Sequence, residues 1–275
     1  MANTSLVTEG GHVRIGSMTD SFVPALVAFD LDDTLAPSKS PMPAPMAQAL
    51  RQLLDVVPVC IISGGQMGQF RSQVLGNLHA NDAELAALHL MPTCGTRYYT
   101  WDGSDWGLVY AHYLSDAQRD AALEAVEREA KRLGLWESQT WGDILEDRGS
   151  QITFSALGQE APLEAKKAWD PTGEKKNTLR EAVAAYLPEL EVRSGGSTSV
   201  DITLKGVDKA YGMRALSEQT GISLDDRLFI GDRLDPDGND YPVKAMGVRT
   251  HAVTGWEDTA AYVTALAQRI AAAKA

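Results

Sequence analysis

The chain has 275 residues, of which 44% are hydrophobic and 23% charged, shares that are typical of a folded globular protein. The 25 lysines and arginines against 37 acidic residues give a formal charge of −12, which argues against a general binder of nucleic acid or anionic membranes. Two cysteines are too few for a disulfide framework and favour a cytoplasmic location. Residues 1–21 have no apolar centre, so we expect a flexible leader there and not a signal peptide.

The first part of the chain alternates between apolar runs and helical spacing. Residues 23–29 and 56–62 are short apolar runs of the kind that form buried parallel strands. Residues 46–54 and 66–75 have the spacing of helices, and residues 94–101 have the pattern of a strand or hairpin. The alternation of strand and helix predicts an α/β fold with a parallel sheet.

The middle of the chain carries a different pattern. Residues 115–133 are rich in Ala, Glu and Arg and predict an amphipathic helix, with Ser115 as its N-cap and Gly134 as its stop. One further helix is predicted at residues 177–186, and strands are predicted at residues 144–146, 151–156, 191–193 and 199–204. We therefore expect a small α+β unit that is inserted into the α/β domain.

The α/β pattern resumes after Gly206. Helices are predicted at residues 208–220 and 258–271, a buried strand at residues 227–230, and a further strand within residues 247–253. The expected fold class is α/β, with a Rossmann-like parallel-sheet core and an inserted α+β cap. The expected division is a leader at 1–21, a core at 22–111 and 203–275, and a cap at 112–202.

The sharpest motif follows the first predicted strand, where Asp30, Asp32 and Asp33 stand directly before Thr34. Like charges this close repel one another unless a cation lies between them, and Mg²⁺ prefers such oxygen ligands. Asp30 and Asp32 are two residues apart, so in an extended chain they can face one side, where one attacks and the other transfers a proton. A solvated acidic turn or a helix cap is the alternative interpretation.

Two further motifs suit a phosphate. Ser63, Gly64 and Gly65 follow the second predicted strand, and the hydroxyl and backbone N–H groups of such a turn can bind a phosphate, although they also make an ordinary turn. Lys209 stands at the start of a later predicted helix, where the helix dipole disfavours a cation. It therefore needs a nearby anion, such as Asp30 or a phosphate, unless it is an ordinary surface lysine.

The fourth motif is Gly231-Asp232, directly after a buried predicted strand and followed by Gly238-Asn239-Asp240. A carboxylate again stands at the carboxyl end of a strand, where α/β proteins bind their ligands. Asp232 can complete a metal site with the first acidic motif, while an acidic surface loop is the alternative.

These four motifs, in this order, resemble the haloacid dehalogenase superfamily of phosphotransferases. The resemblance implies that Asp30 is the nucleophile and that Asp32 is the general acid and base. It also implies that Ser63 and Lys209 hold the phosphoryl group. It implies Mg²⁺ as the cofactor, with Asp30, the backbone carbonyl of Asp32, and Asp232 as its ligands. Substrate contacts are implied for Gly64 and Asn239, and supporting roles for Thr34 and Asp240. Asp33 replaces a Gly that is often found at this variable position.

The inserted segment is similar to the cap of the eukaryotic-type phosphomannomutases, which carry the second type of cap in that superfamily. Residues 146–151, 155–158 and 195–201 carry this resemblance, together with the long Asp-rich loop at 231–241. The resemblance implies that the sugar or its second phosphate contacts a set of four residues, which are Gln73, Arg148, Ser199 and Asp201.

Three positions depart from that family, because Lys39, Gln159 and Lys166 stand where arginines that grip the distal phosphate are expected. Lysine lacks the two-pronged guanidinium, and glutamine has no charge. A mutase needs the distal phosphate grip, whereas a phosphatase needs only one phosphate site. We therefore expect a Mg²⁺-dependent phosphatase that hydrolyses a sugar phosphate through an aspartyl phosphate. The alternative is a phosphohexomutase that interconverts hexose 1- and 6-phosphates.

The expected partner is a small phosphorylated sugar, with no nucleic acid and no membrane. A homodimer through the cap is compatible with the resemblance. A non-catalytic sugar-phosphate sensor is disfavoured, because a protein that only binds its ligand gains nothing from the crowded pair Asp30 and Asp32.

Overall fold

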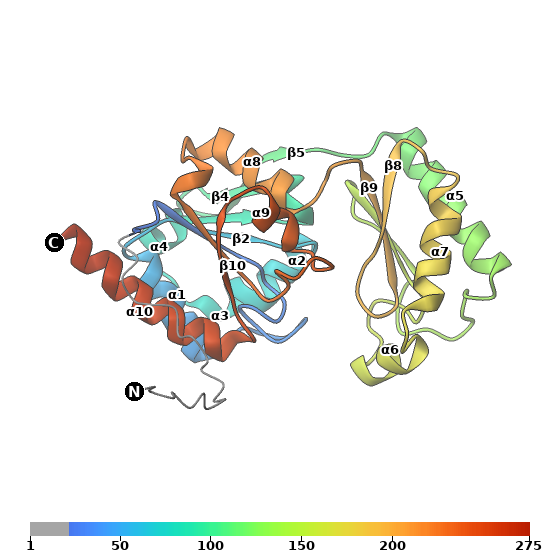
Figure 1. The fold of residues 1–275 in the computed structure, drawn as a ribbon, viewed down its shortest axis with the longest axis horizontal. Coiled ribbons are helices and arrows are strands. Elements are labelled where there is room, and N and C mark those ends of the chain that lie inside the picture. The colour runs from blue at the N-terminus through green and yellow to red at the C-terminus, as the bar shows by residue number, and fades with distance from the viewer. Residues whose placement is uncertain (1–21) are drawn as a thin grey trace, which may run out of the picture.

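The computed structural model describes residues 22–275, so the expected leader at 1–21 lies outside the described residues. Two sheets lie beside each other, each with its own helices (Figure 1). The larger sheet is built from both ends of the described chain, and the smaller one from residues 145–204 between them. This arrangement confirms the expected class, an α/β core with an inserted α+β unit.

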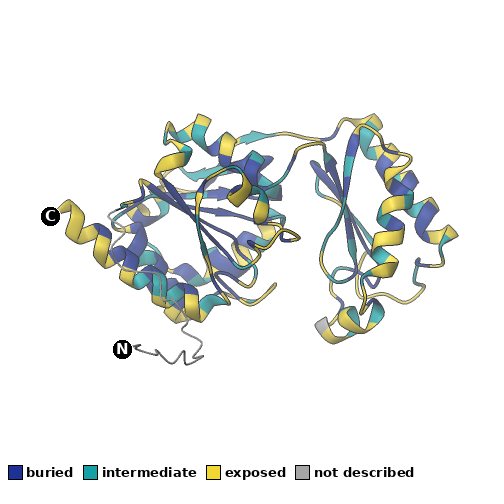
Figure 2. Cartoon of the chain, viewed as in Figure 1, coloured by how far each residue is buried: buried dark blue, intermediate teal, exposed yellow. Residues whose placement is uncertain are grey.

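The core sheet has seven strands in the order β11-β10-β1-β2-β3-β4-β5. The strands from β11 to β3 are parallel, and β4 and β5 continue the sheet antiparallel. Every residue of β1, β2 and β10 is buried, as central parallel strands require (Figure 2). The strands are β1 (Leu26–Phe29), β2 (Val59–Ile62), β3 (Leu88–Met91), β4 (Arg97–Trp101), β5 (Trp106–Ala111), β10 (Arg227–Gly231) and β11 (Arg249–Ala252).

Helices cover both faces of this sheet (Figure 1). Val27 and Phe29 of β1 pack with α1 and α10 on one face, and Leu26 and Ala28 pack with α8 on the other. Among the described residues, no helix is both long and apolar enough to span a membrane. The helices are α1 (Ala44–Leu54), α2 (Met67–Phe70), the π-helix η1 (Arg71–Leu75), α3 (Gly76–Leu78), α4 (Asp82–Ala86), the 3-10 turns η2 (Thr93–Gly95) and η3 (Leu224–Asp226), α8 (Lys209–Thr220), α9 (Tyr241–Ala245) and α10 (Trp256–Lys274).

Two elements of the core differ from the sequence prediction. The single helix expected at residues 66–75 is α2 followed directly by the π-helix η1, which widens the last turns. The sequence pattern does not predict β3, because this strand of 4 residues interrupts its apolar run with the polar His89.

The cap is an antiparallel sheet in the order β6-β7-β9-β8, with α5 and α7 on the face away from the core (Figure 1). Val200 and Ile202 of β9 pack in the hydrophobic cluster of the cap, so the alternate residues Ser199 and Asp201 lie on the face turned toward the core. Ser115 caps α5, as the sequence predicts, and the structure adds a capping box with Gln118. The elements are α5 (Asp116–Arg132), β6 (Leu145–Asp147), β7 (Gln151–Ser155), α6 (Leu163–Trp169), α7 (Glu174–Ala184), β8 (Leu190–Ser194) and β9 (Ser199–Leu204).

The cap sheet runs slightly further along the chain than the expected cap. β9 ends at Leu204, whereas the expected boundary falls at residue 202, inside that strand. The division into a core and a cap as separate folding units stays a prediction.

Candidate active site

The sequence motifs meet at one edge of the core sheet. β1 pairs in parallel with β10 on one side and with β2 on the other, so the residues that follow these strands lie next to one another. Asp30 follows β1, Asp232 follows β10, and Ser63 follows β2. This edge of the sheet faces the cap (Figure 1).

Lys209, the first residue of α8, is a buried cation held by two carboxylates. It is 1% exposed, its Nζ contacts Asp30 Oδ1, and the same Nζ lies 2.6 Å from Asp240 Oδ1. Burial alone would lower the pKa of this ammonium group, but Asp30 and Asp240 more than offset burial and raise its pKa. The cation that the helix dipole disfavours is thus stabilised by two anions.

Asp30, Asp232 and Asp240 form an acidic group in which one carboxylate oxygen from each residue lies within 4.8 Å of the other two. Burial raises the pKa of Asp30 to about 7 against the opposing charge of Lys209. Burial also raises the pKa of Asp232, and repulsion from Asp240 adds to this rise. Carboxylates held so close favour a bound cation, and their oxygen atoms suit Mg²⁺. The group fits the expected cofactor and adds Asp240 to the expected ligands Asp30 and Asp232.

Of the expected supporting residues, Thr34 lies beside this group and Asp240 belongs to it. Thr34 is buried, and its hydroxyl donates a 3.4 Å hydrogen bond to Asp232 Oδ1. Asp240 is fully buried and also accepts a 3.1 Å hydrogen bond from the backbone N–H of Arg233. Asn239 is exposed, and its side chain makes no hydrogen bond to another described residue, so its substrate contact stays a prediction.

The carboxylate of Asp32 is held by the helix α2–η1 and by the loop after β1. Gln69 Nε2 donates to Asp32 Oδ2 at 2.8 Å, and Gln73 Nε2 donates to Asp32 Oδ1 at 3.2 Å. The backbone N–H of Lys39 also donates to Oδ1, at 2.8 Å. Since all three groups donate to it, they fix the direction of the side chain that is expected to transfer the proton.

Gln73 holds other protein groups and leaves little surface for a substrate. It is 2% exposed, and its amide also donates to the Ser40 carbonyl at 3.0 Å, so the expected substrate contact of Gln73 stays a prediction. Sequence reasoning missed Gln69, whose spacing of one helical turn from Gln73 was the available signal. Gly65 makes room for Gln69, because a Cβ on Gly65 would lie 2.0 Å from Gln69 Oε1.

The turn after β2 joins the core to the cap. Ser63 is 4% exposed, and its hydroxyl oxygen accepts a 3.1 Å hydrogen bond from the backbone N–H of Gly65. Arg148 of the cap donates to the Gly64 carbonyl at 3.0 Å and forms a 2.7 Å ion pair with Glu146. Arg148 thus ties a cap strand to the turn that is expected to bind phosphate, while its contact with the sugar stays a prediction.

Ser199 and Asp201 form a polar patch on the cap face that is turned toward the core. Asp201 accepts hydrogen bonds from Gln151 Nε2 at 2.9 Å and Thr153 Oγ1 at 2.8 Å, and burial raises the pKa of its carboxyl. Gly195 packs tightly against both residues, because a Cβ there would lie 2.6 Å from Ser199 Oγ and 2.7 Å from Asp201 Oδ2. The patch can offer polar groups to a sugar between cap and core.

A lysine of the core, Lys39, lies close enough to Lys166 of the cap for its charge to act on it. Lys39 lies in the loop after β1 with a φ of 55°, which is strained for a residue other than glycine. Lys166 belongs to α6 of the cap, and its Nζ donates to the Gln159 carbonyl at 3.0 Å. Burial lowers the pKa of Lys166, and repulsion from the charge of Lys39 lowers it further. Two ammonium groups in this arrangement favour an anion between them.

A sequence profile described as "Eukaryotic phosphomannomutase" matches residues 114–269, which is more than half of the chain. The chain belongs to the eukaryotic phosphomannomutase family. This match confirms the resemblance carried by the cap, and the fold confirms the haloacid dehalogenase-like core.

The relatives cover almost the whole of this chain. A phosphomannomutase from Spinacia oleracea is 27% identical over 246 residues, which cover 86% of this chain and 93% of that protein. One from Schizosaccharomyces pombe is 25% identical over 262 residues, which cover 87% of this chain and 93% of that protein.

Solved structures show the same fold at low sequence identity. An IMP-nucleotidase from Plasmodium falciparum has a TM-score of 0.65 at 16% identity, covering 90% of this chain and 70% of that one. A haloacid dehalogenase-like hydrolase from Bacteroides thetaiotaomicron has a TM-score of 0.62 at 14% identity, covering 88% of this chain and 99% of that one. The family match supports an enzyme of this superfamily and favours the mutase alternative over the phosphatase.

Proposed function

We propose that this protein is a phosphohexomutase, which interconverts hexose 1- and 6-phosphates through an aspartyl phosphate on Asp30. The observation that carries the proposal is the pair formed by Lys39 and Lys166, which supplies cations for a second phosphate. The relatives are named phosphomannomutases, so mannose phosphates are the first substrates to test.

A mutase binds a hexose bisphosphate in two orientations, with one phosphate at the nucleophile and the other at a second cationic site. Lys39 comes from the core and Lys166 from the cap, so a phosphate between them binds only when the cap lies over the core. Each lysine is a point charge without the fork of an arginine, but two of them on one phosphate supply comparable charge. The replacement of arginine by lysine is then compatible with a second phosphate site.

The chemistry of the proposed reaction follows from the carboxylates and Lys209. An oxygen of Asp30 forms a bond to phosphorus while the bond from phosphorus to the sugar oxygen breaks. Lys209, which contacts Asp30, neutralises charge on the phosphoryl oxygens. Asp32, held by Gln69 and Lys39, gives its proton to the leaving sugar oxygen. In the second step a sugar hydroxyl gives a proton to Asp32 and takes the phosphoryl group from Asp30.

The remaining parts of the site hold the phosphoryl group and its charge. The hydroxyl of Ser63 and the backbone of the turn after β2 offer donors to phosphoryl oxygens. A Mg²⁺ ion held by Asp30, Asp232 and Asp240 would supply positive charge to the same oxygens and favour the ionised nucleophile.

A sugar phosphatase is the second candidate, and Gln159 favours it. The Nε2 atom of Gln159 is buried and has no hydrogen-bond partner among the described residues. This neutral amide stands where an arginine of the family is expected, which weakens the grip on a second phosphate. Water in place of a sugar hydroxyl would then take the phosphoryl group from Asp30.

One pair of assays separates the two candidates. The protein is incubated with Mg²⁺, mannose 1-phosphate and a hexose 1,6-bisphosphate, and both mannose 6-phosphate and free phosphate are measured in the same samples. We expect isomerisation to exceed phosphate release, and Asp30→Asn to abolish both. Phosphate release without isomerisation would contradict the mutase and select the phosphatase.

A further inference from the structure

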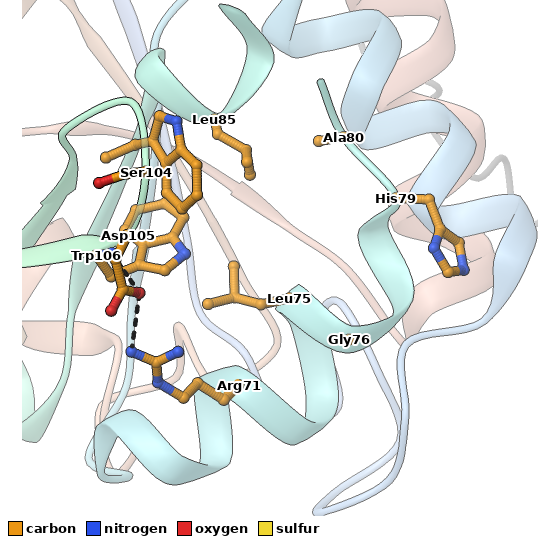
Figure 3. A pocket seen from close by; sticks show the side chains of 10 residues that line it. Arg71, Leu75, Gly76, His79, Ala80, Leu85, Ser104, Asp105 and Trp106 are labelled. Atoms are coloured by element: carbon orange, nitrogen blue, oxygen red, sulfur yellow. Dashed lines mark hydrogen bonds and ion pairs between the residues drawn. The ribbon is translucent and has the colours of Figure 1, made fainter. Parts of the chain in front are cut away.

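An open cavity of about 420 Å³ lies at the surface of the core domain, apart from the catalytic group (Figure 3). Its walls come from η1 and α3 on one side and from the hairpin of β4 and β5 on the other. Asp30, Asp32 and Lys209 do not line it. Its volume falls within the range of about 300–1,000 Å³ that is usual for small-molecule sites.

Aromatic and aliphatic side chains form the inner walls of this cavity. The rings of Trp101 and Trp106 meet edge to face, with centroids 5.7 Å apart and planes at 61°. Leu75 and Leu85 line the same cavity, and Figure 3 shows Leu75 on the side opposite Trp106. A space between an indole and aliphatic side chains suits a flat aromatic ring.

Trp106 also offers a hydrogen-bond donor to this space. Its side chain is 9% exposed, and its indole N–H has no acceptor among the described residues. Trp101 differs, because its indole nitrogen is fully buried and has no hydrogen-bond partner among the described residues. An indole N–H that is largely shielded from water gains from an acceptor, which a ligand can supply.

The rim of the cavity carries charges of both signs. Arg71 Nη2 lies 3.4 Å from Asp105 Oδ1, and the two side chains are 53% and 70% exposed (Figure 3). An exposed ion pair of this kind contributes little to stability, so it can separate to admit a ligand. Because the charges of Arg71 and Asp105 balance, the rim favours an uncharged ligand.

We propose that this cavity binds an uncharged, flat aromatic molecule with a hydrogen-bond acceptor, and that its occupancy alters turnover through the helix α2–η1. Gln69 and Gln73 of this helix hold Asp32, whereas Arg71 and Leu75 line the cavity. η1 is a π-helix, a form that is frequent at functional sites. A ligand against Leu75 therefore bears on the segment that positions Asp32. The effect on turnover rests on the proposed function, whereas the binding does not.

Quinoline and naphthalene make a matched pair of probes, because they share a shape and only quinoline has a ring acceptor. Their binding to the full chain is followed through the indole N–H resonances of the tryptophans. We expect quinoline to bind about tenfold more tightly, as one additional hydrogen bond allows, and to shift the resonance that Trp106→Phe removes. Without the hydrogen bond, naphthalene should bind at least as tightly as quinoline, because it is the more apolar of the two. Equal or tighter binding of naphthalene would therefore overturn the proposal.

Variants on both sides of the cavity complete the test. Trp106→Phe should remove the preference for quinoline, whereas Trp101→Phe should keep it. Leu75→Phe narrows the cavity with a larger side chain and should weaken the binding of both probes, which gives a second test if Trp106→Phe does not fold. Quinoline should lower turnover of the wild type and leave that of Leu75→Phe unchanged. Binding of quinoline with unaltered turnover would overturn the link to Asp32. If the protein is inactive on every sugar phosphate, the proposed function fails, but the indole N–H resonances still show whether quinoline binds.

Discussion

The backbone N–H of Lys39 donates a 2.8 Å hydrogen bond to Asp32, while the charge of the same residue lowers the pKa of Lys166 in the cap. One residue thus connects the proposed acid and base with the proposed site of the second phosphate. Lys39 also has a φ of 55°, and backbone strain of this kind persists where the surrounding structure fixes it.

The first prediction concerns Lys166. Lys166→Ala should weaken the binding of a hexose bisphosphate by about 10- to 100-fold, because a charge-assisted contact contributes about 1.5–3 kcal/mol. Hydrolysis of p-nitrophenyl phosphate, which has no second phosphate, should change little. Lys167→Ala is the matched control, because Lys167 is 61% exposed and pairs with Glu164. Equal losses in the two variants, measured by bisphosphate titration, would refute the lysine site.

The second prediction concerns the residues that hold Asp32. Asp32→Asn should lower turnover of hexose phosphates by about 10² to 10⁴, the usual range of general acid–base catalysis. Gln69→Ala should cause a smaller loss than Asp32→Asn. Gln69→Glu should cause a larger loss than Gln69→Ala, because the new glutamate places a second carboxylate against Asp32. p-Nitrophenyl phosphate needs little protonation of its leaving group, so its first step should suffer less. Pre-steady-state rates that fall equally for both substrates would contradict the acid role.

Local patterns were sufficient to predict which residues meet at the core of the candidate site, whereas their roles came from the family resemblance and stay predictions. Asp30, Ser63 and Asp232 each follow an apolar run, and parallel strands bring their carboxyl ends to the same edge of the sheet. Lys209 could be expected near an anion because its helix position disfavours a lone cation. Neighbouring residues and the rule for parallel sheets thus placed these side chains together, and the resemblance decided against the alternative of ordinary surface turns.

Contacts between distant segments could not be predicted in this way. Lys39 and Lys166 are far apart in sequence. Read one at a time, these lysines in place of arginines suggest a weaker grip on a second phosphate, and the sequence does not show that the two lie close together. Gln69 has no motif of its own, and its role emerges from the close approach of Asp32. The π-helix η1 follows from packing rather than from a pattern, so helical periodicity alone predicts an ordinary helix there.

The third prediction concerns the dependence of stability on pH. Burial, together with the charge of Arg227, lowers the pKa of His89 from 6.5 to about 4. Between these values the unfolded state binds more protons than the folded state, so the contribution of His89 to stability falls as the pH falls from about 6.5 to about 4. His89→Asn should therefore show a smaller loss of stability over this window than the wild type in urea unfolding. An identical loss in both proteins would contradict this assignment.

The last prediction concerns the acidic group and its metal. Removal of divalent cations with a chelator should abolish turnover, and Mg²⁺ should restore it, because Asp30, Asp232 and Asp240 otherwise repel one another. Mg²⁺ should also raise the melting temperature of the wild type, since a ligand that binds only the folded state stabilises it. Asp232→Ala should lose most of this rise and need more Mg²⁺ for half of its activity. Asp235→Ala is the matched control, because Asp235 is exposed and pairs with Arg233 at 2.9 Å. If Asp235→Ala loses the response to Mg²⁺ and Asp232→Ala keeps it, Asp232 is not a metal ligand. The metal would then be held by carboxylates further along the acidic loop.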